Sequence, residues 1–450
     1  MERPARGRHR LHMVLLIVPL ALVLLAMTAL IIWSVYTPTR LQRAIAEAAE
    51  AGVPLTHEAF RAKWGEIPDT ENAASWYLKA FDLMHAPDTD EISNIMDDEA
   101  WPHGQEDLPL AQDYMDRIMT LLDDKTDVLD ILRTARDFEK ACYNVAIDES
   151  ELLLPHLSQA RWCGRLLLLA MLAAVHEGRA DEAVGYALDG LALSRSLSGE
   201  PLIVQSLVAI ATLHTVVEWP LSAALGSPEA GESKLAAIQH ALFEYSRDFS
   251  LRAAIEGELV QQFTQYDTLV TGILEESSGT GWARLLGTGY IRADMARVIE
   301  HYIEFLSDLE RPASEINAIW EKRLAAIEES YWLMVKMIAP SHSRIQAQGE
   351  NARARMQAAA LSVAALRFYR REGRWPDDLD VLTPDYIMEM PSDPFSGRPF
   401  IYRILDDGII IYSVGTNGID DGGRPHLMAT SEQERRDCDY DDVGFRLRLP

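Results

Sequence analysis

The feature that most constrains this chain is an apolar run near its amino terminus. The run reads LHMVLLIVPLALVLLAMTALIIWSVY from Leu11 to Tyr36 and carries no charged residue when His12 is neutral. About 20 apolar residues in a helix cross the roughly 30 Å hydrocarbon core of a bilayer, so this run is long enough to span it. Trp33 and Tyr36 stand at its far end, where amphipathic rings favour the headgroup region. We therefore predict a transmembrane helix at residues 11–36.

The charges around this run predict its orientation. Four arginines precede it, whereas the basic residues that follow are mixed with acids: Arg3, Arg6, Arg8 and Arg10 come before, and Arg40, Arg43, Glu47 and Glu50 come after. The positive-inside rule then keeps residues 1–10 as a basic cytoplasmic tail and exports the rest of the chain. A cleaved signal peptide is the alternative, but its apolar region has only about 7–15 residues. The longer run, with a poor cleavage site at Ala26–Ala29, favours an uncleaved signal anchor with a single pass.

The length, charge and cysteine content of the chain exclude some folds and some classes of binding partner. The chain has 450 residues, too many for one compact core, so we expect about two or three folded units. Its formal net charge is -27, and no basic patch interrupts the body of the chain. Such a surface repels phosphate backbones, so we expect no nucleic-acid partner. The three cysteines, Cys142, Cys163 and Cys438, are too few and too widely spaced for a disulfide framework or a zinc site, although one pair is possible.

Residues 37–340 are predicted to form a large, hairpin- or repeat-like helical domain outside the cytoplasm. Its first segment, Thr39–Ala51, is expected to stand as a helical stalk above the membrane. Two antiparallel helices are expected at 155–178 and 181–199, because glycine ends both runs. Further helices are predicted at Pro201–Leu225, Gly231–Asp248, Leu251–Glu276, Tyr290–Leu309 and Ser314–Met337, with a glycine-punctuated loop at 277–290. Residues 85–107 hold eight acids and no Lys or Arg, which indicates a solvated acidic loop.

Motifs for catalysis do not occur in this helical region. His176 is followed by Glu177, and His214 lies four residues before Glu218, so each histidine could begin a metal site. However, the sequence contains no HExxH pattern and no Gly-x-Ser-x-Gly elbow. We therefore expect ordinary core or surface histidines and no enzyme activity.

The character of the sequence changes in residues 341–450. A long helix is expected to end at Gly373 and to be followed by short strands at Phe400–Ile404, Gly408–Val414 and Val443–Leu449. The Asp407-Gly408 pair between the first two strands is typical of a tight hairpin turn. The whole chain is thus predicted to be mainly α, with a transmembrane helix, a large helical domain and a small α+β module that carries a three-stranded antiparallel sheet.

An ordered series of residues gives this module a family resemblance. The series consists of Ala365-Leu366-x-x-Tyr369, Gly373-Arg374-Trp375-Pro376, Leu379 to Leu382, Pro384-x-Tyr386, Pro391-x-Asp393-Pro394-Phe395, Gly397-x-Pro399 and Tyr412-Ser413-Val414-Gly415. It resembles the globular domain of the major pseudopilin of type II secretion systems over about one fifth of the chain. The whole layout is similar to a group of uncharacterised, membrane-anchored bacterial proteins that join an ENAA-containing helical region to such a tail. These resemblances imply the inner membrane of a bacterium, with the bulk of the chain in the periplasm.

The pseudopilin resemblance also implies a structural calcium ion. In that family the loop after the Tyr-Ser-x-Gly strand binds calcium, and the matching positions here are Asp420, Asp421, Asp441 and Asp442, with Asn417 as a possible addition. Calcium binds six to eight hard oxygen ligands, and carboxylates gathered in one loop repel one another without a cation. The alternative is a solvated acidic loop that stays mobile.

Three functions remain open. The first is a non-enzymatic, membrane-anchored interaction or scaffold protein with a calcium-stabilised terminal module and an unidentified protein partner. The second is a component of a type II secretion or pilus-like machine, although the chain has no prepilin cleavage motif. The third is an exported hydrolase, because carboxylates or histidines from different helices can form a site that sequence spacing does not reveal.

Overall fold

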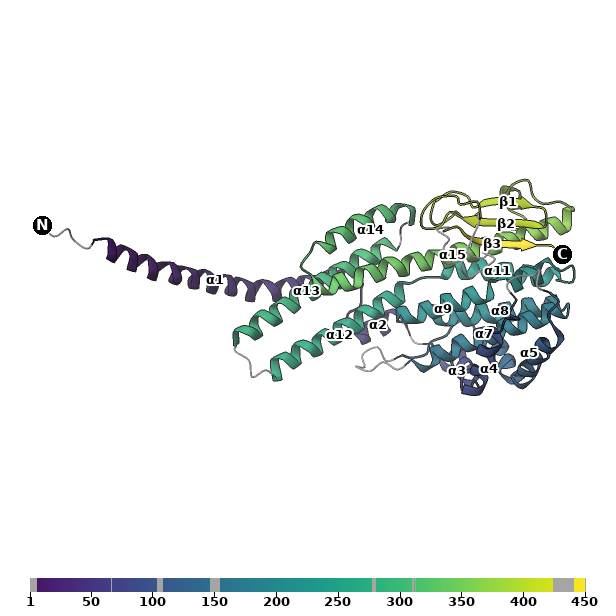
Figure 1. Ribbon diagram of the computed structural model, residues 1–450, viewed down its shortest axis with the longest axis horizontal. Coiled ribbons are helices and arrows are strands. Elements are labelled where there is room, and N and C mark those ends of the chain that lie inside the picture. Colours follow the sequence, from purple (N-terminus) through teal and green to yellow (C-terminus); the bar gives the residue numbers. More distant parts are fainter. Residues whose placement is uncertain are drawn as a thin grey trace.

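The computed structural model describes residues 6–65, 67–102, 108–145, 154–276, 281–309, 311, 313–423 and 441–449. Figure 1 shows a long amino-terminal helix that leaves an elongated helical body, with a small sheet at the opposite end. The described residues contain fifteen α-helices and one three-stranded antiparallel sheet near the carboxyl end. The predicted fold class, a mainly helical chain with an apolar first helix and a terminal sheet, is confirmed.

The first helix, α1 (Arg6–Glu50), joins the apolar run to the body without a break. Its apolar side chains are open to the surroundings; Leu25 is 67% exposed and Ile32 is 62% exposed. It is therefore apolar enough to cross a membrane and is not a buried core helix. The pair α9 (Ile203–Val216) and α10 (Trp219–Gly226), bent by 41°, passes the same composition test, but most of its side chains lie inside the body.

The segment 39–51, expected to stand as a helical stalk above the membrane, is helical but packs into the body. The carboxyl half of α1 packs on α13 (Gly281–Asp308), and Thr37, Ala44 and Ala48 are buried there. The Arg40 guanidinium lies 3.1 Å from the Glu300 carboxylate across this contact. Small side chains on α1 allow the close approach, so the segment is a core element of the body.

The acidic segment 85–107 also differs from its prediction, because its first half is a helix. Residues 103–107 lie outside the described chain, but α4 covers Ala86–Met96. The Asp88 carboxylate accepts a hydrogen bond from the His85 backbone N–H at the helix start, 2.8 Å away, and forms an ion pair with Lys125 at 2.8 Å. A helix N-terminus favours an acid such as Asp88, and Ile92 and Ile95 bury the apolar face of the helix.

Helices α3 to α7 share one hydrophobic cluster. Their bounds, with those of α2, are α2 (His57–Trp64), α3 (Ala74–Asp82), α5 (Gln112–Asp124), α6 (Thr126–Ala135) and α7 (Pro155–His176). The predicted hairpin is present: α7 turns at Gly178, whose φ is +74°, into α8 (Ala180–Ser198). Left-handed backbone suits glycine, which explains why this residue ends the helix. The long helix predicted over Pro201–Leu225 is instead the bent pair α9 and α10.

The next helices follow the prediction only in part. The helices α11 (Glu232–Asp248) and α12 (Arg252–Glu276) match their predicted ranges. The predicted glycine loop at 277–290 is wrong from residue 281 onward, where α13 begins, and residues 277–280 lie outside the described chain. The predicted helix at Ser314–Met337 is two helices, α14 (Ala313–Glu328) and the start of α15 (Leu333–Glu372).

The 40-residue helix α15 organises the carboxyl half. It contacts α11, α13 and α14 as well as strands β2 (Gly408–Ser413) and β3 (Val443–Arg448). Residues Ala358 to Leu366 are all buried. Buried residues of the helical body, of α15 and of the sheet belong to one continuous hydrophobic cluster. The predicted domain boundary between residues 340 and 341 therefore falls inside one helix, and the sheet packs directly against the helical body.

The sheet has the predicted strands, shifted by one residue at some ends. They are β1 (Ile401–Leu405), β2 (Gly408–Ser413) and β3 (Val443–Arg448), in the order β1-β2-β3, with Leu405 paired to Gly408 across the turn. A short 3-10 helix, η3 (Leu379–Leu382), lies between α15 and the sheet. The backbone N–H of Arg448 donates to Ser222 of α10, which ties β3 to the body.

Asp393 fastens the segment before the sheet. Its carboxylate is 2% exposed and accepts hydrogen bonds from the Ser413 hydroxyl (2.5 Å), the Ser396 hydroxyl (2.6 Å) and the Phe395 backbone N–H (2.9 Å). A buried carboxylate with several donors holds its neighbours strongly, because each donor would otherwise be left without an acceptor.

We predict that Asp393→Asn lowers the free energy of unfolding by about 2–3 kcal/mol, since an amide group turns one acceptor into a donor facing other donors. Denaturant unfolding of the full chain in detergent measures this. Asp406→Asn, at an exposed position in the β1–β2 turn, is the matched control and should change stability by less than about 0.5 kcal/mol. Equal effects of the two substitutions would contradict the role of Asp393.

Candidate functional site

The loop that follows β2 brings the predicted calcium ligands together with the residues that precede β3. The Asn417 side chain donates to the Asp421 carboxylate (3.1 Å), and the Asn417 backbone N–H donates to the Asp441 carboxylate (3.0 Å). The Asp441 backbone N–H donates to Asp421 (3.3 Å). Asn417, Asp421 and Asp441 thus form one hydrogen-bonded cluster, although the last lies 20 positions or more from the others.

The Asp420 side chain has partners outside this hydrogen-bonded cluster. Its carboxylate lies 2.9 Å from the Arg403 guanidinium of β1 and accepts a hydrogen bond from the Tyr412 hydroxyl at 2.8 Å. The pKa of Asp420 is lowered, because these hydrogen bonds and that of the Gly422 backbone N–H outweigh the cost of desolvation. Both of its oxygens already have donors, so Asp420 fits a calcium site less well than the other four residues.

Asp442 is the buried member of the predicted set. It is 3% exposed; one oxygen accepts from the Gly423 backbone N–H at 2.8 Å, and the other is buried with no hydrogen-bond partner. Burial raises its pKa, and the charges of Asp421 and Asp420 add to the rise. A cation would satisfy both the orphaned oxygen and the repulsion, so the chemistry of Asn417, Asp421, Asp441 and Asp442 suits a hard cation. Within the described chain, however, no three acidic, histidine or cysteine side chains converge in a metal-binding arrangement.

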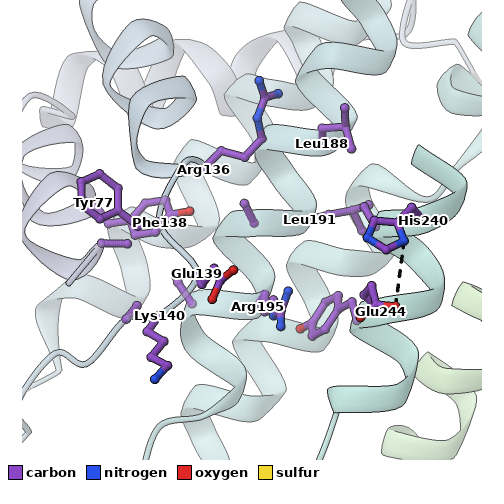
Figure 2. A pocket seen from close by; sticks show the side chains of 16 residues that line it. Tyr77, Arg136, Phe138, Glu139, Lys140, Leu188, Leu191, Arg195, His240 and Glu244 are labelled. Carbon is purple, nitrogen blue, oxygen red and sulfur yellow. Dashed lines mark ion pairs between the residues drawn. The ribbon is translucent and has the colours of Figure 1, made fainter. Parts of the chain in front are cut away.

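A second candidate site is a cavity in the helical body, which the sequence did not reveal. It has a volume of about 250 Å³. It lies between helix α8, helix α11 and the segment that follows α6. Figure 2 shows Tyr77 and Phe138 on one side, Leu188 and Leu191 of α8 along the middle, and His240 and Glu244 of α11 on the other side. The wall is mostly apolar, with a few charged groups among the lining residues.

The charges around this cavity come from several helices. Arg136, Lys140 and Arg195 supply positive charge, and the His240 ring lies 3.9 Å from the Glu244 carboxylate. Arg195 also forms an ion pair with Asp248. An apolar floor with a small number of charged groups is typical of a binding pocket.

Behind the cavity, Asp189 of α8 holds the Arg136 side chain. The Asp189 side chain is fully buried and lies 2.7 Å from the Arg136 guanidinium. Burial raises the pKa of Asp189 to about 6, and the guanidinium groups of Arg136 and Arg133 oppose the rise. This acid therefore positions a lining residue. This role is visible only in the folded structure, because Arg136 and Asp189 lie far apart in the sequence and no short motif links them.

The histidines considered from sequence have structural roles. His176 accepts a hydrogen bond from the Leu110 backbone N–H at 3.3 Å. Burial and the Arg355 charge lower the pKa of His214 to about 3, which keeps its ring neutral. Among the described residues, neither histidine belongs to a group of three His, Cys, Asp or Glu side chains that could hold a metal ion.

An unforeseen histidine pair lies in the core near α14. The rings of His301 on α13 and His342 on α15 are stacked, with His301 Nε2 3.1 Å from His342 Nδ1, and both residues are at most 1% exposed. Phe305 and Trp320 pack on them. Burial lowers the pKa of each to about 3, and for His301 the neighbouring His342, Arg297 and Arg323 lower it further.

We predict that this pair makes the folded protein acid-sensitive. Between about pH 6.5 and pH 3 the unfolded chain binds protons at both histidines and the folded chain does not, so stability falls as the pH falls below 6.5. Each histidine then costs roughly 1.4 kcal/mol per pH unit. The double variant His301→Phe/His342→Phe should flatten the loss of stability measured by denaturant unfolding from pH 7 to pH 5. His240→Gln, at an exposed histidine, should leave it unchanged; the same slope in all three proteins would refute the prediction.

Comparison with known proteins adds no assignment. Searches against protein-family models, curated proteins and solved structures find no match. The features of this protein that bear on its function are therefore the loop after β2, the cavity beside α8 and the apolar helix α1.

Proposed function

We propose that the protein is a single-pass, membrane-anchored binding or scaffold protein, without enzyme activity, whose body lies outside the cytoplasm of a bacterial cell. The observation that carries this proposal is α1, which runs from an exposed apolar stretch directly into a packed contact with α13. A single helix of this kind anchors a body at the membrane surface. The basic residues before the apolar run favour a cytoplasmic amino terminus.

The cavity beside α8 supports recognition of a protein partner. Pockets for small molecules commonly enclose about 300–1,000 Å³, whereas this one has about 250 Å³, close to the size of one large side chain. Its apolar wall suits an aromatic or aliphatic anchor from a partner. Charges of both signs, from Arg136, Lys140, Arg195, Glu139 and Glu244, suit polar groups beside that anchor. We therefore assign this cavity as the site where a partner inserts a side chain.

The carboxyl-terminal module is proposed to be stabilised by calcium through Asn417, Asp421, Asp441 and Asp442, with Asp420 at the edge. The orphaned, buried oxygen of Asp442 supports this proposal. The pseudopilin-like residue series in the same module supports a second candidate function, a role beside a secretion or pilus-like machine. A hydrolase is the least supported function, because the buried acids Asp189 and Asp393 are held by structural partners.

The recognition proposal predicts that filling the cavity abolishes partner binding. Ala192 is a half-buried lining residue, so Ala192→Trp occupies the cavity without changing the core. Chemical cross-linking in intact membranes should yield a discrete adduct with the wild-type protein and lose it in this variant. Ala211→Trp, the same change at an exposed alanine of α9, should keep the adduct. An adduct that survives Ala192→Trp would contradict the assignment of the cavity.

The calcium proposal predicts a shift in thermal stability. The melting temperature of the full chain in detergent should rise with calcium and fall with chelator, because a cation removes the repulsion among the loop acids. The variant Asp421→Asn/Asp442→Asn should melt at one temperature in both conditions, whereas Asp406→Asn should keep the shift. A wild-type melting temperature that is the same with calcium and with chelator would rule out a stabilising ion.

A further inference from the structure

One wall of the cavity beside α8 is an extended segment, residues 138–145, which we call the strap. The strap follows α6 and belongs to no helix and to no strand of the sheet. Its residues Phe138, Glu139, Lys140 and Ala141 line the cavity. Figure 2 shows the first three of them across the cavity from α11. The position of the strap therefore sets the width of the cavity.

One edge of the strap is held by Asn72, the asparagine of the Glu-Asn-Ala-Ala series before α3. Asn72 is 5% exposed. Its side-chain oxygen accepts a hydrogen bond from the Cys142 backbone N–H (2.9 Å), and its side-chain nitrogen donates to the Cys142 carbonyl (2.9 Å). The Ala73 backbone N–H donates to the Lys140 carbonyl at 2.9 Å. An amide that pairs with both backbone groups of one residue fixes that residue much as a neighbouring strand would.

The other edge is held by Glu200, which follows α8. Glu200 Oε1 accepts from the Tyr143 backbone N–H (3.0 Å), and Oε2 accepts from the Gln205 side chain (3.2 Å). The Ser196 hydroxyl gives its proton to the Leu193 carbonyl, so the Tyr143 hydroxyl, 3.0 Å away, donates to Ser196. Hydrogen bonds on both sides thus fix the strap between the start of α3 and the end of α8.

Glu200 is a buried acid that has hydrogen-bond donors but no cation beside it. It is 2% exposed, and within the described chain no Lys, Arg or His forms an ion pair with it. Burial raises the pKa of Glu200 to about 7, although the hydrogen bonds from Tyr143 and Gln205 oppose the rise. Gln205 Oε1 is buried without a hydrogen-bond partner, so this amide can turn and accept the proton of neutral Glu200. The closed strap therefore favours neutral Glu200.

The titratable groups on the elements packed around Glu200 have partners of their own or are buried. On α12, which contacts Pro201, Glu256 forms ion pairs with Lys63 and Arg252. Glu258 accepts a hydrogen bond from the Ile203 backbone N–H. Burial favours the neutral form of the three groups beside Tyr143, since it raises the pKa of the phenol and thiol and lowers that of the imidazole. These groups are Tyr77 of α3 and Cys163 and His156 of α7.

We propose that the strap controls access to the cavity beside α8, with Asn72 as its constant attachment and Glu200 as an attachment that ionisation weakens. This inference rests on the proposed recognition site. When the strap opens, Glu200 meets water, and water stabilises the charged carboxylate that the closed strap disfavours. A partner side chain then has more room to enter beside α8.

The direction of the pH effect follows from the two states of Glu200. Its pKa is about 7 under the closed strap and returns toward the ordinary value of 4.5 when the strap is open. Because the closed state has the higher pKa, it is most stable below about pH 4.5, weakens as the pH rises toward 7, and changes little above 7. Access to the cavity is therefore greater at neutral pH than at acidic pH.

Hydrogen–deuterium exchange of the full chain in detergent tests this proposal. The exchange of a peptide that contains Cys142 and Tyr143 is corrected for the intrinsic effect of pH on exchange. Its opening equilibrium should rise roughly 30-fold from pH 5.5 to pH 8, the ratio that the two pKa values give. Peptides of α7 should not show this rise, because the buried pair His301 and His342 makes the whole fold less stable at low pH.

Three variants separate the two attachments. Glu200→Gln has no ionisable group but keeps an acceptor for Tyr143, so its strap should open equally at both pH values. Asn72→Ala should raise strap exchange at both pH values and keep the roughly 30-fold ratio. Glu139→Gln, at an exposed acid of the strap itself, is the matched control and should behave like the wild type. Protected α7 peptides verify that each variant is folded.

Equal strap opening of the wild type at pH 5.5 and pH 8, or an unchanged ratio in Glu200→Gln, would overturn the role of Glu200. Unchanged exchange in Asn72→Ala would overturn the other attachment. The cross-linking experiment above is independent of these results. Loss of the pH effect with a surviving adduct would overturn control by the strap and leave the recognition site intact. A pH-dependent strap in a protein that yields no adduct would support the strap and contradict the recognition site.

Discussion

The contact between α1 and α13 determines how this protein is organised. A membrane helix followed by a flexible linker would only tether its body, but here Ala44 and Ala48 of the same helix are buried in the body and Arg40 pairs with Glu300. The apolar segment and the folded core therefore share one continuous helix.

A second long helix, α15, extends this continuity to the far end. Its buried alanines allow α11, α13 and the sheet to approach it from different sides, and one hydrophobic cluster links all of them. The terminal sheet is consequently attached to the helical body through α15 and α10. A cation in the loop after β2 would then stabilise the end of one continuous structure, not an independent module.

The elements that the sequence predicted well depend on local chemistry. The apolar run, the turn at Gly178 and the Asp407-Gly408 hairpin are each specified by a few adjacent residues, and each appears where expected. The predictions were wrong where charge or glycine content was taken to indicate a loop. The acids of α4 lie on a helix that Asp88 caps and that Ile92 and Ile95 bury on one face, and the start of α13 is helical although its glycines suggested a loop.

The candidate sites show the same difference between features that adjacent residues specify and features that depend on contacts between distant residues. The family resemblance groups Asn417, Asp420, Asp421, Asp441 and Asp442 in one calcium loop. Hydrogen bonds link Asn417, Asp421 and Asp441, whereas Asp420 pairs with Arg403 of β1, a contact that no local pattern indicates. The cavity beside α8 could not be predicted at all. It is formed by residues from the α3, α6, α8 and α11 regions, and its positioning acid, Asp189, has no sequence signature.

The most direct measurement of the central claim is the state of the amino terminus in the cell envelope. Membranes are washed at alkaline pH, the retained protein is analysed by mass spectrometry, and intact spheroplasts are treated with protease. An uncleaved anchor predicts that the protein stays in the membrane, that peptides from residues 1–36 are recovered, and that external protease digests the body. A soluble product that begins beyond residue 26, or a body protected inside the spheroplast, would contradict the account.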